Sequence, residues 1–90
     1  MLENLRDEID KIDEKLVALL AARFSAAEKI AIEKQKTGKN VFDGDRERKI
    51  LEKIRRLARE KNFSPAIATR IFENLFHESR RAQEIKRKQL

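Results

Sequence analysis

Five polar side chains interrupt the apolar stripes of a strongly helical sequence, and their types suggest binding chemistry. They come from three separate segments of the chain, and they are Arg23, Lys34, Glu47, Ser79 and Gln83. A charged side chain at a core position destabilises a protein by several kcal/mol unless it is paired or binds something. The simplest common cause is a polar pocket enclosed by helices, with two cations and mostly neutral or acidic hydrogen-bonding partners. Such a pocket predicts a small anionic ligand that carries hydroxyl or ether oxygens.

Each of the five residues also has an explanation that needs no ligand. Arg23 can fix the register or oligomeric state of packed helices, Lys34 can extend its charged end to solvent, and Glu47 can interact favourably with a helix dipole. Ser79 can bond to its own backbone, and Gln83 can be solvated near a fraying helix end. A shared pocket accounts for all five at once, so we take it as the working hypothesis.

The composition excludes several kinds of chemistry. The chain has no cysteine, which excludes a disulfide framework, a cysteine-based zinc site and a thiol nucleophile. The single His77 lies outside the apolar face of its predicted helix and has no second histidine near it, so we expect neither a metal site nor a histidine-based triad. Ser79 lacks an evident base, and there is no glycine-rich phosphate loop. What remains is binding, or catalysis by positioning and electrostatics without a metal or cofactor.

Glycine and proline divide the chain into the elements that must position these residues. Two glycines bracket a short polar stretch, and Pro65 follows Ser64 in the arrangement of an N-cap and a first helical residue. Either Asp43 or Asp45 is expected to cap the helix that follows the glycines. The scarcity of aromatic and turn residues argues against a sheet. We therefore predict one all-α domain over residues 1–90, with helices at about residues 3–37, 45–61 and 65–88.

The first predicted helix carries a heptad seam along its whole length. Its members recur at alternating steps of three and four, and they are Leu2, Leu5, Ile9, Ile12, Leu16, Leu19, Arg23, Ala26 and Ile30. Some 35 residues extend roughly 50 Å as a helix, whereas a compact chain of this length has a radius of gyration of about 12 Å. The seam therefore predicts an intertwined homodimer in which a second copy covers it. The alternative is a monomer in which the other two helices fold back over the entire seam.

The charge balance suggests an anionic partner. The chain has 22 lysines and arginines against 16 acidic residues, for a net charge of +6. A nucleic-acid-binding module is one alternative, suggested by the basic residues Arg55, Arg56, Arg59, Lys61, Arg80, Arg81, Lys86, Arg87 and Lys88. These are interspersed with glutamates and lack an aromatic stacking set, so solvated helix faces are the preferred interpretation. No apolar stretch approaches the roughly 18 residues of a membrane span, and the start lacks a signal-peptide layout, so we expect a cytoplasmic protein.

Several motifs match one family in order and in spacing. They are Leu5-Arg6-Asp7-Glu8-Ile9-Asp10 with Ile12-Asp13, Leu19-Leu20-Ala21-Ala22-Arg23, Lys34, Asp43-Gly44-Asp45-Arg46-Glu47-Arg48, and Glu78-Ser79 followed by Gln83. With these motifs the chain resembles the all-helical class of chorismate mutase over essentially its whole length. The resemblance implies an intertwined three-helix homodimer with two equivalent active sites and no cofactor. It also implies the rearrangement of chorismate to prephenate, on the route to phenylalanine and tyrosine.

The resemblance implies a role for each matching residue. Arg6 and Arg23 would hold the two carboxylates of chorismate. Lys34 would contact a carboxylate and the ether oxygen, and Gln83 would donate to that oxygen from the other side. Because Arg6 and Arg23 lie 17 positions apart, roughly 25 Å along one helix and about 100° around it, they cannot hold one small diacid from the same helix. The expectation is that Arg6 comes from the partner chain.

The remaining matches complete the implied site. Glu47 would bind the ring hydroxyl, helped by the backbone at Asp43, while Ser79 would add a carboxylate contact and Arg46 a supporting charge. A lyase that removes pyruvate from isochorismate uses a similar site on the same fold, and it stays open as an alternative. The complete match to the mutase pattern, including Glu47 and Gln83, favours the mutase.

Overall fold

The protein consists of three α-helices joined by two short connections. A computed structural model describes all residues, 1–90, and its helices are α1 (Leu2–Lys36), α2 (Gly44–Glu60) and α3 (Pro65–Lys88). The prediction of an all-α fold with three helices is confirmed, and every boundary falls within one residue of the expected one. Differences of this size are normal at helix ends.

Short-range interactions explain where the helices begin and end. Asp43, one of the two expected caps, accepts a hydrogen bond from the backbone N–H of Arg46 at 3.0 Å and so begins α2. Ser64 accepts one from the N–H of Ile67 at 3.2 Å, directly before Pro65 of α3. Beyond the end of α1, Gly38 adopts a left-handed backbone with φ 71°, a conformation that glycine adopts without the steric cost of a Cβ. These local signals set the lengths of the elements that surround the site.

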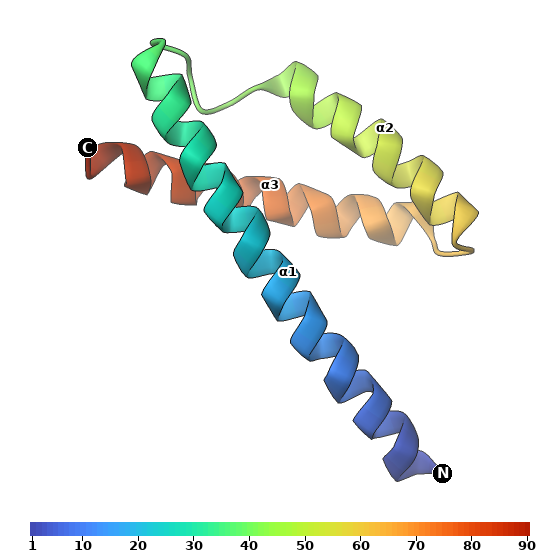
Figure 1. Ribbon diagram of the computed structural model, residues 1–90. Coiled ribbons are helices and arrows are strands. Elements are labelled where there is room, and N and C mark those ends of the chain that lie inside the picture. Colours follow the sequence, from blue (N-terminus) through green and yellow to red (C-terminus); the bar gives the residue numbers. More distant parts are fainter.

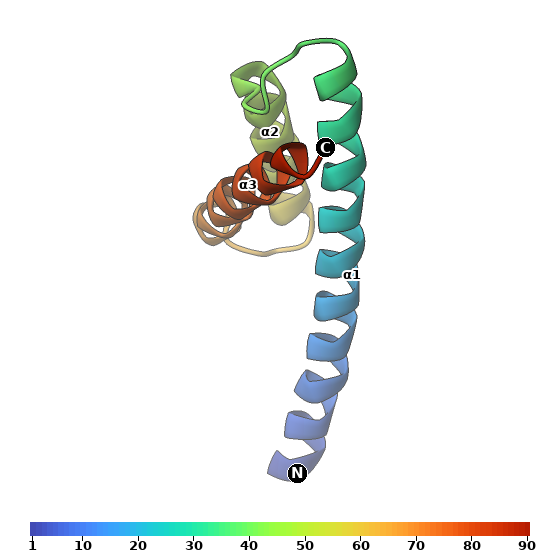
Figure 2. The same ribbon diagram turned by 90° about the vertical axis from the view of Figure 1, so that its left-hand side faces the viewer.

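α3 is the helix that holds the other two together. It packs along α2 and crosses the C-terminal half of α1, whereas the backbones of α1 and α2 do not approach one another (Figure 1). Seen from the side, α2 and α3 lie on one flank of α1 (Figure 2). The N-terminal half of α1 projects beyond both of them, so the molecule measures 54 × 26 × 14 Å and has a radius of gyration of 16.0 Å.

The apolar seam of α1 is largely uncovered in the single chain. Every residue from Met1 to Ala22 is exposed in the single chain, and the seam residues Leu5, Ile9 and Leu16 are 55%, 55% and 52% exposed. α2 and α3 therefore do not fold back over the whole seam, as the monomeric alternative required. None of the three helices is long and apolar enough to cross a lipid bilayer.

Candidate active site

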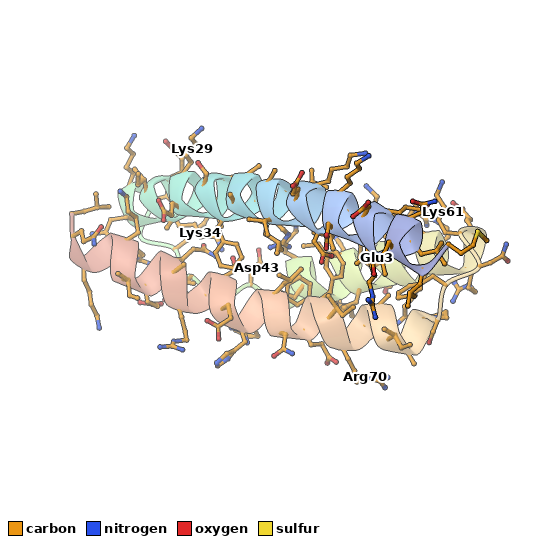
Figure 3. The ribbon with its side chains drawn as sticks, turned by 90° about the horizontal axis from the view of Figure 1, so that it is seen from below. Glu3, Lys29, Lys34, Asp43, Lys61 and Arg70 are labelled. Carbon is orange, nitrogen blue, oxygen red and sulfur yellow. The ribbon has the colours of Figure 1, made fainter.

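A polar cavity lies where the C-terminal half of α1, the start of α2 and the second half of α3 meet. Its volume is about 460 Å³, within the range typical of small-molecule sites. The structure brings together seven of the eight residues singled out from the sequence, namely Arg23, Lys34, Asp43, Arg46, Glu47, Ser79 and Gln83. Lys34 and Asp43 lie between the ribbons of α1 and α3, whereas Lys29 and Arg70 point outward (Figure 3).

Arg23 presents an unneutralised cation to the cavity from α1. Its guanidinium lies over the rings of Phe72 and Phe76, with its central carbon 5.9 Å and 5.8 Å from their centroids. Such cation–π contacts hold the charged group in place. No carboxylate of the chain pairs with Arg23, so its N–H groups remain available to an anion.

Lys34 supplies the second free cation on the same helix. Its Nζ donates a hydrogen bond to the backbone carbonyl of Val41, at 2.8 Å, in the loop between α1 and α2. An ammonium group has three N–H donors, so two remain free after this bond. Because a neutral carbonyl, not a carboxylate, holds Lys34, its charge remains available in the cavity.

Ser79 and Gln83 form a buried polar pair on α3. They are only 6% and 8% exposed, and the Gln83 Nε2 donates to the Ser79 Oγ at 3.3 Å. The other amide atom of Gln83, Oε1, is buried without a partner. Turning the amide by 180° would let Ser79 donate to Oε1 and leave Nε2 as the unpartnered group. In either orientation one buried polar atom of Gln83 is unsatisfied, which is a feature expected of a group that meets a ligand.

The first turn of α2 carries the acidic side of the cavity. The carboxylate of Asp43 is engaged in capping the helix, while Glu47 receives two bonds from Nη1 of Arg80, at 2.7 Å to Oε1 and 2.5 Å to Oε2. Arg46 is exposed at the cavity edge and makes no ion pair. With Arg23, Lys34, Arg46 and Arg80, four cations face two carboxylates, so the cavity carries a positive surplus that suits an anionic ligand.

Arg80 is a cavity residue that sequence reasoning missed. The sequence placed it among the solvated basic residues of the last helix, and that interpretation is wrong because Arg80 is half-buried in the cavity wall. The signal that could have found it is the spacing of Phe76, Arg80 and Gln83, steps of four and three that put all three on one helix face. The neighbouring Arg81 is exposed, as expected.

Arg6 does not reach the cavity within one chain. It lies near the start of α1, in the half that projects beyond α2 and α3 (Figure 1), and it is not among the residues that line the cavity. Its side chain is 62% exposed and donates to Glu3 at 3.1 Å. Within one chain, therefore, Arg6 does not meet a ligand held in this cavity.

The fold and the site define a small all-helical protein with a cation-rich, hydrogen-bonding cavity suited to an organic anion. The family described as chorismate mutase type II matches residues 5–84. The chain belongs to this family of isomerases.

Individual relatives agree with the family match. The chain is 35% identical over 83 residues to a chorismate mutase of Methanocaldococcus jannaschii, an alignment that covers 92% of this chain and 84% of that protein. It is 36% identical over 75 residues to a bifunctional chorismate mutase/prephenate dehydratase of Escherichia coli, covering 83% of this chain and 19% of that protein. A bifunctional relative of the same name from Aquifex aeolicus is 44% identical over 59 residues, or 66% of this chain and 16% of that protein. The chain thus spans less than a fifth of these two bifunctional proteins.

Proposed function

We propose that residues 1–90 form one chorismate mutase domain, which rearranges chorismate to prephenate in phenylalanine and tyrosine biosynthesis. The observation that carries the proposal is the cavity in which two unpaired cations, Arg23 and Lys34, share space with the buried, unsatisfied amide of Gln83. A dicarboxylate with an ether oxygen matches these groups. The expected cytoplasmic location stays a prediction.

The reaction makes modest chemical demands on the protein. It is a unimolecular pericyclic shift, so it requires no acid, base, nucleophile or cofactor. The enzyme must hold the compact diaxial conformer of the substrate and stabilise the charge that develops on the ether oxygen as its C–O bond lengthens. Preorganised donors in a cavity shielded from water achieve the second task well, because they need no reorganisation during the reaction.

Lys34 and Gln83 are the donors proposed to act on the ether oxygen. The carbonyl of Val41 holds the Lys34 ammonium at the cavity and leaves two of its N–H groups free. The Gln83 Nε2 carries two N–H groups; one donates to the Ser79 Oγ, and the other is proposed to donate to the same ether oxygen from α3. Arg23 binds a substrate carboxylate, and its contact with two aromatic rings keeps it in position beforehand.

The remaining polar groups are proposed to recognise the rest of the substrate. Glu47 accepts a hydrogen bond from the ring hydroxyl, with help from the backbone at Asp43. Ser79 contributes a carboxylate contact next to Gln83. Arg46, exposed at the cavity edge and free of ion pairs, adds a supporting positive charge.

The proposal includes an intertwined homodimer. The seam of α1 is exposed in the single chain, and a second apolar surface, a groove of about 320 Å³, lies between the end of α2 and the start of α3. Its lining includes Leu57, Phe63 and Ile71, which are 37%, 47% and 50% exposed. We infer that the projecting half of the partner's α1 fills this groove, since each copy offers both a seam and a groove, as twofold symmetry requires.

Such a dimer completes the cavity with the missing cation. Phe72 lines the groove and also lies under the guanidinium of Arg23, so the groove and the cavity adjoin at this ring. A helix lying in the groove would pass close to Arg23. On this proposal, Arg6 of the partner subunit binds the second carboxylate of the substrate.

The test is an assay of the purified protein with chorismate and with isochorismate, together with a mass measurement in solution. We expect prephenate from chorismate and a dimeric mass. Release of pyruvate from isochorismate without prephenate formation would indicate the lyase instead, and no turnover of either compound would refute the proposal.

A pair of lysine variants tests the role of the cavity. Lys34→Ala should lower kcat on the order of 100-fold or more, the typical effect of removing one preorganised donor. Lys29→Ala removes a lysine from the outward face of the same helix and should leave kcat unchanged. Circular dichroism checks that both variants fold, and full turnover by Lys34→Ala would contradict the proposed role.

A further inference from the structure

The wall of the cavity contains one ion pair that the proposed mechanism leaves unused. Arg80 of α3 directs Nη1 at both carboxylate oxygens of Glu47 in α2. The two side chains are 32% and 22% exposed, so the pair is shielded from solvent much more than the surface ion pairs of this protein. It is also the one ion pair that joins two different helices.

A second contact fixes the orientation of the arginine. The central carbon of its guanidinium lies 5.3 Å from the centroid of Phe42, in the loop that leads into α2. The ring and the carboxylate hold Arg80 from two sides, which restricts the rotamers available to its long side chain. The guanidinium therefore reaches Glu47 without the full entropic cost of ordering a free surface arginine.

Glu47 carries a negative charge in the cavity, and Arg80 compensates that charge. The ligand expected here carries two negative charges, and Glu47 is the carboxylate of the cavity that is not engaged in capping a helix. An uncompensated carboxylate next to a dianion would weaken binding through like-charge repulsion. A carboxylate has about four acceptor positions, so the bonds from one nitrogen of Arg80 leave it able to accept another hydrogen bond.

We propose that Arg80 is a positioning residue that acts through Glu47 to recognise the ring hydroxyl of the substrate. It holds the carboxylate at one place in the wall, cancels its charge toward the dianion, and leaves acceptor positions free for the hydroxyl. This inference rests on the proposed function, in which Glu47 meets the ring hydroxyl. It also makes the site selective, because a fixed, partly buried acceptor disfavours substrates that lack a hydrogen-bond donor at that position.

The ring hydroxyl does not react, so its contact should exist in both the bound substrate and the transition state. Loss of such a contact raises KM more than it lowers kcat. Arg80→Gln is therefore expected to raise KM about 10-fold or more, the usual scale for removing the charged partner of a hydrogen bond. Arg80→Lys, which keeps the charge, should recover part of the loss. Arg81→Gln removes the adjacent, exposed arginine and should leave KM unchanged.

A double-mutant cycle separates positioning from mere structural support. The cycle measures KM and kcat of the protein of residues 1–90 with chorismate for Arg80→Gln, Glu47→Gln and the double variant. If Arg80 acts through Glu47, adding Arg80→Gln to Glu47→Gln should change KM little. The Glu47→Gln variant no longer has a carboxylate for Arg80 to position, and no negative charge at residue 47 repels the substrate. Thermal unfolding of all variants reports their stability separately.

Each outcome has a distinct meaning. Independent, multiplicative effects of the two substitutions on KM would overturn the inference and indicate that Arg80 supports the loop through Phe42 alone. An unchanged KM for Arg80→Gln would overturn it as well. If Arg80→Gln does not fold, the same cycle is measured with Arg80→Lys. The inference then requires that Arg80→Lys raises KM partly in the unmodified protein and does not raise it when Glu47→Gln is also present. Absence of mutase activity in the unmodified protein would refute the proposed function itself.

Discussion

The two halves of α1 differ in how one chain covers them. In the C-terminal half, Ala27 and Ala31 are buried, with Ala31 fully inaccessible, because small side chains let α3 cross closely at this point. In the N-terminal half the apolar positions are large, such as Ile9 and Leu16, and about half of each remains exposed. Small residues thus occupy the two buried positions of the C-terminal half, whereas the large seam residues of the N-terminal half have no helix of the same chain to cover them.

This difference indicates that the halves have different packing partners. A contiguous line of half-exposed leucines and isoleucines on a helix is typical of a surface that packs against another molecule. The polar residues follow the same division, since every proposed site residue except Arg6 lies in the part that the chain itself encloses. We infer that one half of α1 builds the cavity and the other half is the contribution that each copy makes to its partner.

Charging the seam should produce the largest effect. Ile9→Lys would bury an ammonium group against apolar surface twice in each symmetric dimer, at a cost of several kcal/mol per copy. We expect loss of the dimer in analytical ultracentrifugation and a fall in mutase activity on the order of 100-fold or more. Glu14→Lys places the same side chain on the opposite face of the same half-helix and should preserve both mass and activity. A dimeric, active Ile9→Lys would show that the seam is not an interface.

The second prediction concerns the sharing of each site between two chains. Arg6→Ala and Arg23→Ala should each lose most activity alone, because each removes a carboxylate-binding cation from both sites. When the two variants are unfolded together and refolded, half of the dimers should be mixed, and each mixed dimer should contain one site with both arginines intact. Recovery of about a quarter of the unmodified activity is expected from this arithmetic.

Two controls accompany the mixing experiment. Each variant refolded by itself should stay inactive, which excludes recovery caused by refolding alone. If Arg6 instead served the cavity of its own chain, each site of a mixed dimer would lack one of its two arginines, and mixing would restore no activity. That result would show that the projecting half of α1 does not contribute to the active site of the partner.

The fold was predictable because its signals are local. Local signals determine the helix ends within a turn, without long-range contacts; they are Ser64 followed by Pro65, Asp43 as a cap, and Gly38 of the first loop. The seam likewise follows from spacing alone. The crossing of α1 by α3 at Ala27 and Ala31 was not predictable, because the sequence pattern does not report where along a long helix its neighbour packs.

The candidate site was predictable as a set of inward polar residues but not as a set of contacts. Periodicity identifies a polar residue on an apolar face, and this places Gln83 and Ser79 correctly in a buried position. It cannot report that Arg80 meets Glu47, because that contact depends on the distance between α2 and α3. Nor does it reveal that the loop carbonyl of Val41 holds Lys34, since loop paths carry no periodic signal.

The smallest effect is expected at Gln83 of α3, in the part of the molecule that the chain itself encloses, and it depends on pH rather than on assembly. In Gln83→Glu only the protonated carboxyl can donate to the ether oxygen, and the ionised form would repel the charge that develops there. The free glutamate pKa is about 4.3; burial at residue 83 would raise the pKa of the new carboxyl, and the cations of the same cavity would lower it. Activity of the variant should therefore rise as the pH falls toward that pKa, whereas the amide of the unmodified protein does not titrate.

Variants at Gln83 and in the seam should also differ in how their activity responds to protein concentration. Gln83 is enclosed by its own chain, so the pH dependence of Gln83→Glu should be the same at all protein concentrations that keep the dimer intact. The activity of a weakened seam variant such as Ile9→Ala should instead recover as its concentration rises, because mass action restores the dimer. Kinetics of both variants over a range of pH and concentration measure the two dependences. A flat pH profile for Gln83→Glu would mean that residue 83 does not donate to the reacting oxygen.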